Sequence, residues 1–377
     1  MIDFDIYKDI APYTGEEVTN AISRILSNYD LIKGYIGSLI PKSEENREAK
    51  QEALSQYIAN CLKNVKSYED FQKTITAPIF LDAILKTSSK GLTYSGLENL
   101  KPDESYLFIS NHRDIILDCS FCDYALNKEG LKLCEMAIGD NLLSNKIVED
   151  LLRLNGGIII KRELPLREKY AESIRVSQYM VAKVASGQSV WIAQKSGRSK
   201  DGLDITHSSI IKMLGLSQKR LGVEFSDLIK NIKIVPVSIS YEKDPNDINK
   251  AKELHSLAVN GSYTKGDKED LMTMALGLSG DKGHIHISFG TPLTDKTYSD
   301  AVEVAKDVDL QNHANYKLYP SAWFAYDYLN NNNNNSDKYK DLNTEEFLAR
   351  YKDLDEEVKV IALNIYANSV RAFLKEI

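Results

Sequence analysis

The sequence predicts an α/β fold: a mixed, mainly parallel sheet covered by helices, with helical extensions at both ends. Three observations predict this class. Short runs rich in Ile, Val and aromatic residues alternate with helical patterns in the middle of the chain. Both ends have a purely helical periodicity. Of the 377 residues, 43% are hydrophobic and 27% are charged, which is typical of a globular protein.

The N-terminal region, residues 1–88, is predicted to be helical. Apolar residues recur there at three- and four-residue steps, first at Ile22, Ile25, Leu26 and Tyr29, and again, after a polar stretch, at Leu54, Tyr57, Ile58 and Leu62.

The central region, residues 89–297, is predicted to hold the sheet. Strand-like runs follow Gly91, and the helical pattern of Arg167–Ser186 separates two of them. The runs are Tyr106–Ser110, Gly157–Ile160, Ser189–Ala193, Ile232–Ser240 and His284–Phe289. Strands separated by helices of that length predict a sheet that is covered on both faces.

The C-terminal region, residues 298–377, returns to helix, with Ser299 as the expected N-cap. Asn330–Asn335 is a run of six asparagines that predicts an exposed loop. A helix capped by Asn343 or Thr344 should follow, with a long apolar stripe from Phe347 to Phe373. We expect this stripe to pack on the protein rather than on a membrane, because acidic residues such as Asp353 and Glu357 follow its polar face.

Composition excludes several classes of protein. The 47 Lys and Arg against 54 Asp and Glu give a net charge of −7, so we expect no nucleic acid partner. The cysteines, Cys61, Cys119, Cys122 and Cys134, are too few for a disulfide framework and favour the cytoplasm. We find no signal-peptide pattern and no run of about 18 apolar residues that would span a bilayer.

The stretch Leu107–Asp118 is the most informative part of the sequence. A predicted strand ends at a polar corner that holds His112, with Asp114 and Asp118 downstream. Histidine accepts protons near neutral pH, and a carboxylate on its other ring nitrogen fixes the tautomer. Neither aspartate has the spacing of a regular helix. We expect His112 to lie in the turn before the helix, with Asp118 folding back to it and Asp114 capping the helix.

Three further blocks follow in order: Gly156-Gly-Ile-Ile-Ile-Lys-Arg162, then Val190 to Gly202 with Gln-Lys-Ser-Gly-Arg-Ser at its centre, then Ile234-Val-Pro-Val-Ser-Ile239. With the Asn-His block, they resemble the glycerolipid acyltransferase family, which includes the glycerol-3-phosphate and lysophosphatidate acyltransferases. The resemblance covers about residues 90–295. The chain departs from the family pattern in two places: residue 117 is Leu where the family has Asp, and Lys195-Ser196 replace the Glu before Gly197.

The resemblance implies a fatty acyl transfer from acyl-CoA or acyl carrier protein to the hydroxyl of a phosphorylated glycerol or lysophospholipid. His112 would be the general base and Asp118 would orient it. The residues implied to bind substrate are Asn111, Arg113, Lys161, Arg162, Lys195, Gly197, Arg198 and Ser199. No metal or redox cofactor is implied. The product is a lipid, so we expect peripheral contact with the cytoplasmic face of a membrane.

Alternatives from other classes are a catalytically inactive lipid-binding protein of the same fold and an acyl thioesterase. Cys119 and Cys122 have a metal-like spacing, but no second pair follows and both lie in a predicted buried helix. His284 and His286 share one strand face, where we expect satisfied histidines near a sheet edge rather than metal ligands.

Overall fold

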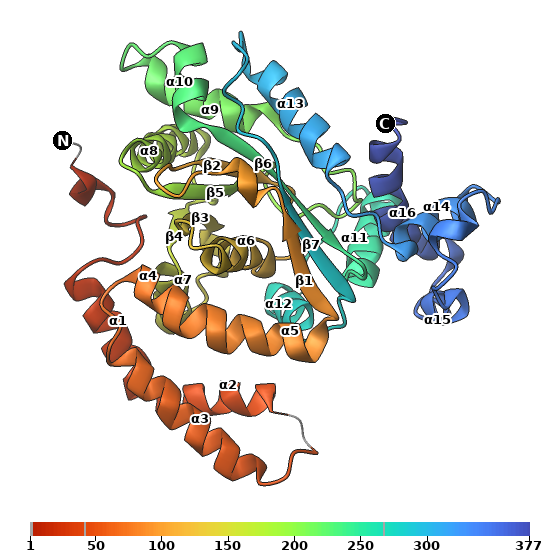
Figure 1. Cartoon of the computed structure of the whole chain (residues 1–377), viewed down its shortest axis with the longest axis horizontal. Coiled ribbons are helices and arrows are strands. Elements are labelled where there is room, and N and C mark those ends of the chain that lie inside the picture. Colours follow the sequence, from red (N-terminus) through yellow and green to blue (C-terminus); the bar gives the residue numbers. More distant parts are fainter. Residues whose placement is uncertain (1–2, 41–42, 267) are drawn as a thin grey trace.

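A mixed sheet forms the centre of the computed structural model, which describes residues 3–40, 43–266 and 268–377. Within these residues the sheet has seven strands in the order β1-β7-β6-β2-β5-β3-β4. The strands are β1 (Gly91–Ser95), β2 (Leu107–Ser110), β3 (Cys134–Gly139), β4 (Gly157–Ile160), β5 (Ser189–Ala193), β6 (Ile234–Tyr241) and β7 (His284–Phe289). Neighbouring strands are parallel except β6 and β7, which are antiparallel. The predicted α/β class is confirmed (Figure 1).

Side chains alternate between two helical layers, one on each face of the sheet. Leu107 and Ile109 of β2 belong to a core with the helices α8 (Leu166–Ala185), α9 (Ser208–Lys219), α10 (Phe225–Ile232) and α13 (Ala301–Ala314). Phe108, between them, packs on the other face with the helices α5 (Asp82–Ser88) and α6 (Leu117–Lys128). Figure 1 shows these two layers above and below the sheet. This alternation is the period of two that strand geometry imposes.

Two strands, β1 and β3, lie outside the five strand-like runs that we expected. We did not predict β3 because the charged residue Glu135 interrupts its run of apolar residues. Glu135 is fully buried, and it accepts hydrogen bonds from the hydroxyls of Tyr68 (3.2 Å) and Tyr179 (2.6 Å). Lys183 Nζ lies 2.8 Å from it as well. These partners compensate a charge that burial would otherwise make costly.

Pro236 lies inside β6 although proline cannot donate to a sheet ladder. Its carbonyl accepts from Gly290 N at 2.8 Å, so the missing N–H would point toward β7. Regular pairing with β7 begins only at Val237, opposite Phe289, so no ladder bond is lost at Pro236.

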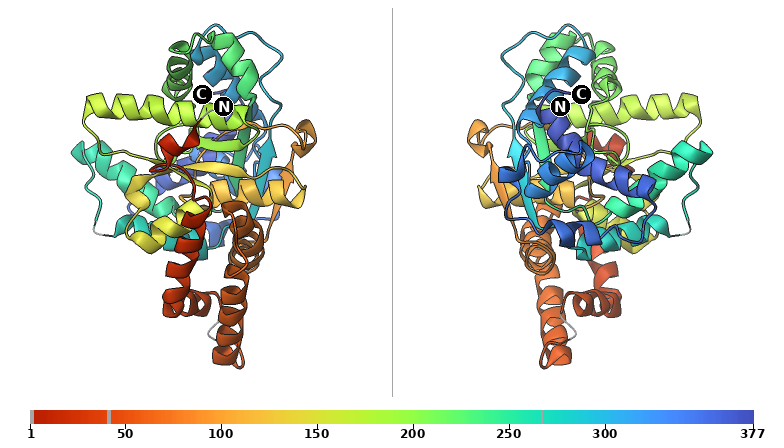
Figure 2. Two further views of the ribbon diagram at one scale, coloured as in Figure 1. Left: turned by 90° about the vertical axis from the view of Figure 1, so that its left-hand side faces the viewer. Right: turned by 90° about the vertical axis from the view of Figure 1, so that its right-hand side faces the viewer.

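The N-terminal helices form an arm that extends from the sheet (Figure 2). It contains α1 (Glu16–Ser27), α2 (Tyr29–Leu39), α3 (Arg47–Leu62) and α4 (Tyr68–Phe71), followed by a π-helical segment (Gln72–Leu81) that continues into α5. Pro78 lies inside the π-helical turn, where a proline removes a donor from the regular helical ladder. These elements lie within residues 1–88, the region that we expected to be helical, of which residues 1, 2, 41 and 42 lie outside the described part of the chain.

The C-terminal helices pack against the body of the protein as expected. They are α14 (Pro320–Leu329), α15 (Thr344–Ala349) and α16 (Glu356–Phe373), and they share a core with α11 (Asp247–Asn260). The apolar stripe is divided between α15 and α16 rather than carried by one helix. Asp300, not Ser299, caps α13, because its carboxylate accepts from Val302 N and Glu303 N. Asn343 caps α15.

Asn330–Asn335 is a mostly exposed loop, tied at its end because Asn335 donates to the buried carboxylate of Asp327 from both its backbone and side-chain nitrogens. The remaining helices are α7 (Lys146–Leu154) and α12 (Glu269–Ser279). Within the described part of the chain, no helix combines the length and apolarity that crossing a membrane requires.

Candidate active site

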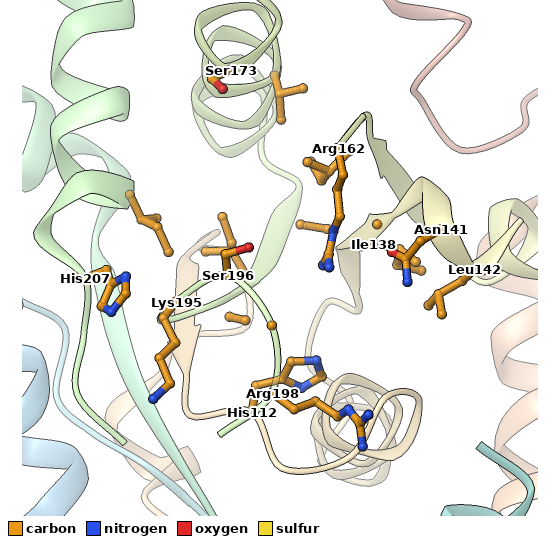
Figure 3. A pocket seen from close by; sticks show the side chains of 18 of the residues that line it. His112, Ile138, Asn141, Leu142, Arg162, Ser173, Lys195, Ser196, Arg198 and His207 are labelled. Carbon is orange, nitrogen blue, oxygen red and sulfur yellow. The ribbon is translucent and has the colours of Figure 1, made fainter. Parts of the chain in front are cut away.

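His112 lies just after β2, in the turn that leads into α6. Its Nδ1 is 2.8 Å from Asp118 Oδ2, and the His112 side chain is 15% exposed whereas that of Asp118 is fully buried. An Nδ1–H that donates to this carboxylate leaves the lone pair on Nε2. Nε2 has no hydrogen-bond partner among the described residues, and the ring points into a cleft (Figure 3).

The Asp118 carboxylate is held from several sides. Oδ2 also accepts the backbone N–H groups of Arg113 (2.5 Å) and Asp114 (2.9 Å), and Oδ1 accepts the hydroxyl of Tyr241 (2.8 Å). Burial and then the charge of Asp118 raise the pKa of Tyr241 well above its ordinary value, so the phenol remains a donor. The carboxylate is therefore fixed in position before any substrate binds.

Asp114 has a different role from Asp118. Its Oδ1 accepts from Ile116 N (3.0 Å) and Leu117 N (2.9 Å), and so caps the start of α6. Burial and then the charge of Asp118 raise its pKa. Of the two candidates, Asp118 is the carboxylate that contacts His112. The six-residue spacing works because residues 112–116 form a turn and α6 begins only at Leu117.

The cleft beside His112 has a volume of about 740 Å³ and lies over the carboxyl ends of β2, β3, β4 and β5. Its apolar lining includes Ile160, Val176, Met180, Ile192, Ile210 and Met213. Its lining also includes the cations Lys161, Arg162, Lys195, Arg198 and Lys200. The carboxyl ends of parallel strands are where α/β sheets usually place their ligands.

Arg162 follows β4, and Lys195 and Arg198 both follow β5, so the ends of two strands bring these cations to the cleft (Figure 3). None of the ion pairs found among the described residues includes any of these three. Arg162 passes so close to Gly139 that a Cβ there would lie 2.3 Å from Arg162 Nε. Lys161 differs, because Asp9 (2.7 Å) and Glu172 (3.6 Å) already neutralise it. The three unpaired cations are available for an anion.

The segment that contains this cleft matches a known protein family. Residues 91–240 match the family model described as Acyltransferase. This stretch of the chain therefore resembles an acyltransferase domain. The matched residues include His112, Asp118, Arg162 and the Lys195–Ser199 turn, and the predicted family resemblance is confirmed.

A solved structure that resembles this chain is the crystal structure of the 1-acyl-sn-glycerophosphate (LPA) acyltransferase PlsC from Thermotoga maritima. The sequences are 16% identical, the alignment covers 78% of this chain and 91% of that one, and the TM-score is 0.39. Among curated protein sequences, none matches this chain.

Three residues expected to bind substrate do not line the cleft of the acyltransferase domain. Asn111 is fully buried, with its amide bonded to Asp204 Oδ2 and to both backbone polar groups of Ile239. Arg113 also turns inward, where its guanidinium lies 2.5 Å from Asp204 Oδ2. Ser199 is buried, and its N–H donates to His112 O at 2.6 Å. These contacts give all three residues a role in holding the turn that carries His112, and their expected contact with substrate stays a prediction.

Asp204 is the shared partner of this support and was not singled out from the sequence. Burial would raise its pKa, but the Arg113 charge and donors such as Asn111 lower it on balance. Tyr316 also donates to it, at 2.8 Å. The residue stands in a loop with no local motif, and its partners lie far away in the sequence.

Tyr241 and Trp191 are two further site residues that sequence reasoning missed. Trp191 packs edge-on against His112, with the ring centroids 5.8 Å apart. Trp191 lies in the predicted run Ser189–Ala193, and Tyr241 directly follows the predicted run Ile232–Ser240. Tyr241 ends β6, and carboxyl ends of neighbouring parallel strands meet at one edge, so that position was a usable signal.

The metal-like candidates have other partners. Cys119 and Cys122 are buried free thiols in α6. His284 lies 2.8 Å from Glu242, and His286 contacts the hydroxyls of Thr93 (2.7 Å) and Ser95 (3.1 Å). The interpretation of both as satisfied histidines agrees with this geometry.

Proposed function

We propose that the protein is an O-acyltransferase that moves a fatty acyl group from acyl-CoA or acyl carrier protein to the hydroxyl of a phosphorylated glycerol or lysophospholipid. The observation that carries this proposal is the His112–Asp118 pair, 2.8 Å apart, beside a cleft that is lined by both apolar and cationic side chains. The acyltransferase-family match of residues 91–240 supports the same reaction class.

The proposed chemistry begins with the acceptor hydroxyl beside His112 Nε2. Nε2 takes the hydroxyl proton while the oxygen attacks the thioester carbonyl carbon. The tetrahedral intermediate collapses, the C–S bond breaks, and the imidazolium returns the proton to the departing thiolate. Asp118 stabilises the imidazolium and keeps Nε2 directed at the acceptor. The proton that leaves the hydroxyl ends on the departing thiol, and no atom changes oxidation state. The step as written therefore needs no metal or redox cofactor.

The remaining cleft residues fit the two substrates. Arg162 and Arg198 would bind the acceptor phosphate, because a guanidinium can give two parallel hydrogen bonds to phosphate oxygens, and Lys195 would add a point charge. The apolar lining residues, among them Val176, Met180 and Ile210, would contact the acyl chain. We further propose that the protein works at the cytoplasmic face of a membrane.

The test is the release of free thiol from an acyl thioester by purified protein, measured with and without a panel of acceptors. We expect release only when an acceptor is present, and we expect His112→Ala to abolish it while the protein stays folded. Release without any acceptor would support the thioesterase alternative. Binding of acyl-CoA without any release would support the inactive lipid-binding alternative.

A further inference from the structure

Two hydrophobic side chains stand out on the surface of the described residues. Leu166, the first residue of α8, is 86% exposed, and Met272, in the first turn of α12, is 69% exposed. They are the two most exposed large hydrophobic side chains in the described part of the chain. Isolated exposed apolar residues are common on protein surfaces. Their positions therefore decide whether they indicate a binding surface.

Both residues belong to elements that border the same cleft. Lys169 and Ser173 of α8 line it, and so do Asp270 of α12 and Lys265 just before α12. Figure 2 shows that α8 and the region around the start of α12 extend beyond the sheet on one side of the molecule. Leu166 and Met272 therefore each lie within a few residues of side chains that line the cleft.

The charge around this opening differs from that of the whole chain. The described residues that line the cleft include seven Lys and Arg side chains against three carboxylates, in a chain whose net charge is −7. Three cations lie close to Leu166 in the sequence: Arg162, Arg167 and Lys169. None of them takes part in an ion pair found among the described residues, although Glu163 and Glu168 are also near in sequence. Near Leu166 the rim thus combines an exposed apolar tip with unpaired cations, whereas Glu269 and Asp270 precede Met272 and Asp270 pairs with Lys265.

We propose that this rim docks on an anionic phospholipid bilayer, with Leu166 and Met272 inserted at the interface and the cleft open toward the lipid. Burying the apolar side chains between the headgroups and the acyl chains lowers the free energy of binding. Cations are attracted to the negatively charged surface of the bilayer. The proposal rests on the proposed function, because a lipid substrate could then pass from the bilayer to His112 without crossing water. The proposed reaction alone does not determine which face of the protein contacts the membrane.

The test uses sucrose-loaded vesicles and the full-length protein. Wild-type protein, Leu166→Glu and Met272→Glu are sedimented with phosphatidylcholine vesicles that do or do not contain phosphatidylglycerol. Leu221→Glu is the matched control, because Leu221 is 66% exposed but lies between α9 and α10, outside the cleft lining. We expect binding that needs phosphatidylglycerol, falls at least about tenfold in both rim variants and is unchanged in the control.

The docking proposal is overturned if the wild-type protein does not bind these vesicles, or if Leu221→Glu weakens binding as much as the rim variants do. A rim variant that changes the oligomeric state without lipid would instead assign the face to a second copy of this chain. Failure of the proposed function gives a different result: acceptor-dependent thiol release is absent in the wild type while rim-dependent vesicle binding persists. Circular dichroism confirms that each variant is folded.

Discussion

The hydroxyl of Tyr241 donates to Asp118 Oδ1 at 2.8 Å, on the carboxylate oxygen that His112 does not use. Tyr241 ends β6 and Asp118 lies in the first turn of α6, so the contact joins the sheet to the helix that follows the histidine. The phenol thus orients a carboxylate that in turn orients the imidazole, which makes Tyr241 a positioning residue.

We expect Tyr241→Phe to remain folded and to lower kcat about 5- to 30-fold, because removing one such donor costs about 1–2 kcal/mol. Without that donor, Asp118 presents more negative charge to the imidazole. The acidic limb of the pH–rate profile should therefore move to higher pH. A purely structural role would lower stability without moving that limb, so the profile and a denaturant titration together decide between them.

Asp118 and Asp114 should respond very differently to the same substitution. Asp118→Asn should leave the protein folded and reduce kcat by orders of magnitude, because an amide misorients the ring and cannot stabilise imidazolium. Asp114→Asn should keep most activity, since Asn caps a helix about as well as Asp. Steady-state kinetics on folded variants measures both. The reverse ranking would contradict our assignment of the His112 partner.

Arg198→Ala should raise KM for the acceptor far more than KM for the acyl donor. The loss of a bidentate contact to a phosphate costs about 1.5–3 kcal/mol, which corresponds to roughly a 10- to 150-fold effect. Measuring both KM values, with one substrate saturating at a time, tests this. Equal effects on the two substrates would show that Arg198 does not hold the acceptor phosphate.

Gly139→Ala should act on the site through Arg162. The added Cβ would lie 2.3 Å from Arg162 Nε and 2.5 Å from Asn141 Oδ1, both of which are ends of flexible side chains that can move. We therefore expect little loss of stability but a raised acceptor KM, with a smaller increase than Arg162→Ala would cause. Thermal unfolding measures the stability, and steady-state kinetics measures KM. An unchanged acceptor KM would contradict a role for Arg162 in acceptor binding.

The sequence predicted the fold class and five of the seven strands in the described residues, because burial of apolar side chains leaves a local compositional signal. It missed β3 because Glu135 is neutralised by residues distant in sequence, such as Tyr68 and Lys183. The same limit applies at the site. The pattern indicated His112 and the flanking residues, but whether Asn111 or Arg113 faces the cleft depends on Asp204, a loop residue that no local pattern identifies.

Asp123 provides a prediction for the pH dependence of stability. Burial in α6 raises its pKa to about 7, although Cys134 N (2.7 Å) donates to the carboxylate. The folded state therefore binds a proton that the unfolded state, with an ordinary pKa of about 3.9, has lost, so this group makes stability fall as pH rises from about 4 to about 7. Asp123→Asn removes the titrating group and keeps an acceptor for Cys134 N, but its NH2 replaces the oxygen that accepts from Gln72 Nε2 at 2.7 Å. We expect the stability of this variant to fall less than that of the wild type as pH rises from about 4 to about 7. Urea titrations across this range measure it, and a pH-independent difference would contradict the assignment of the titration to Asp123.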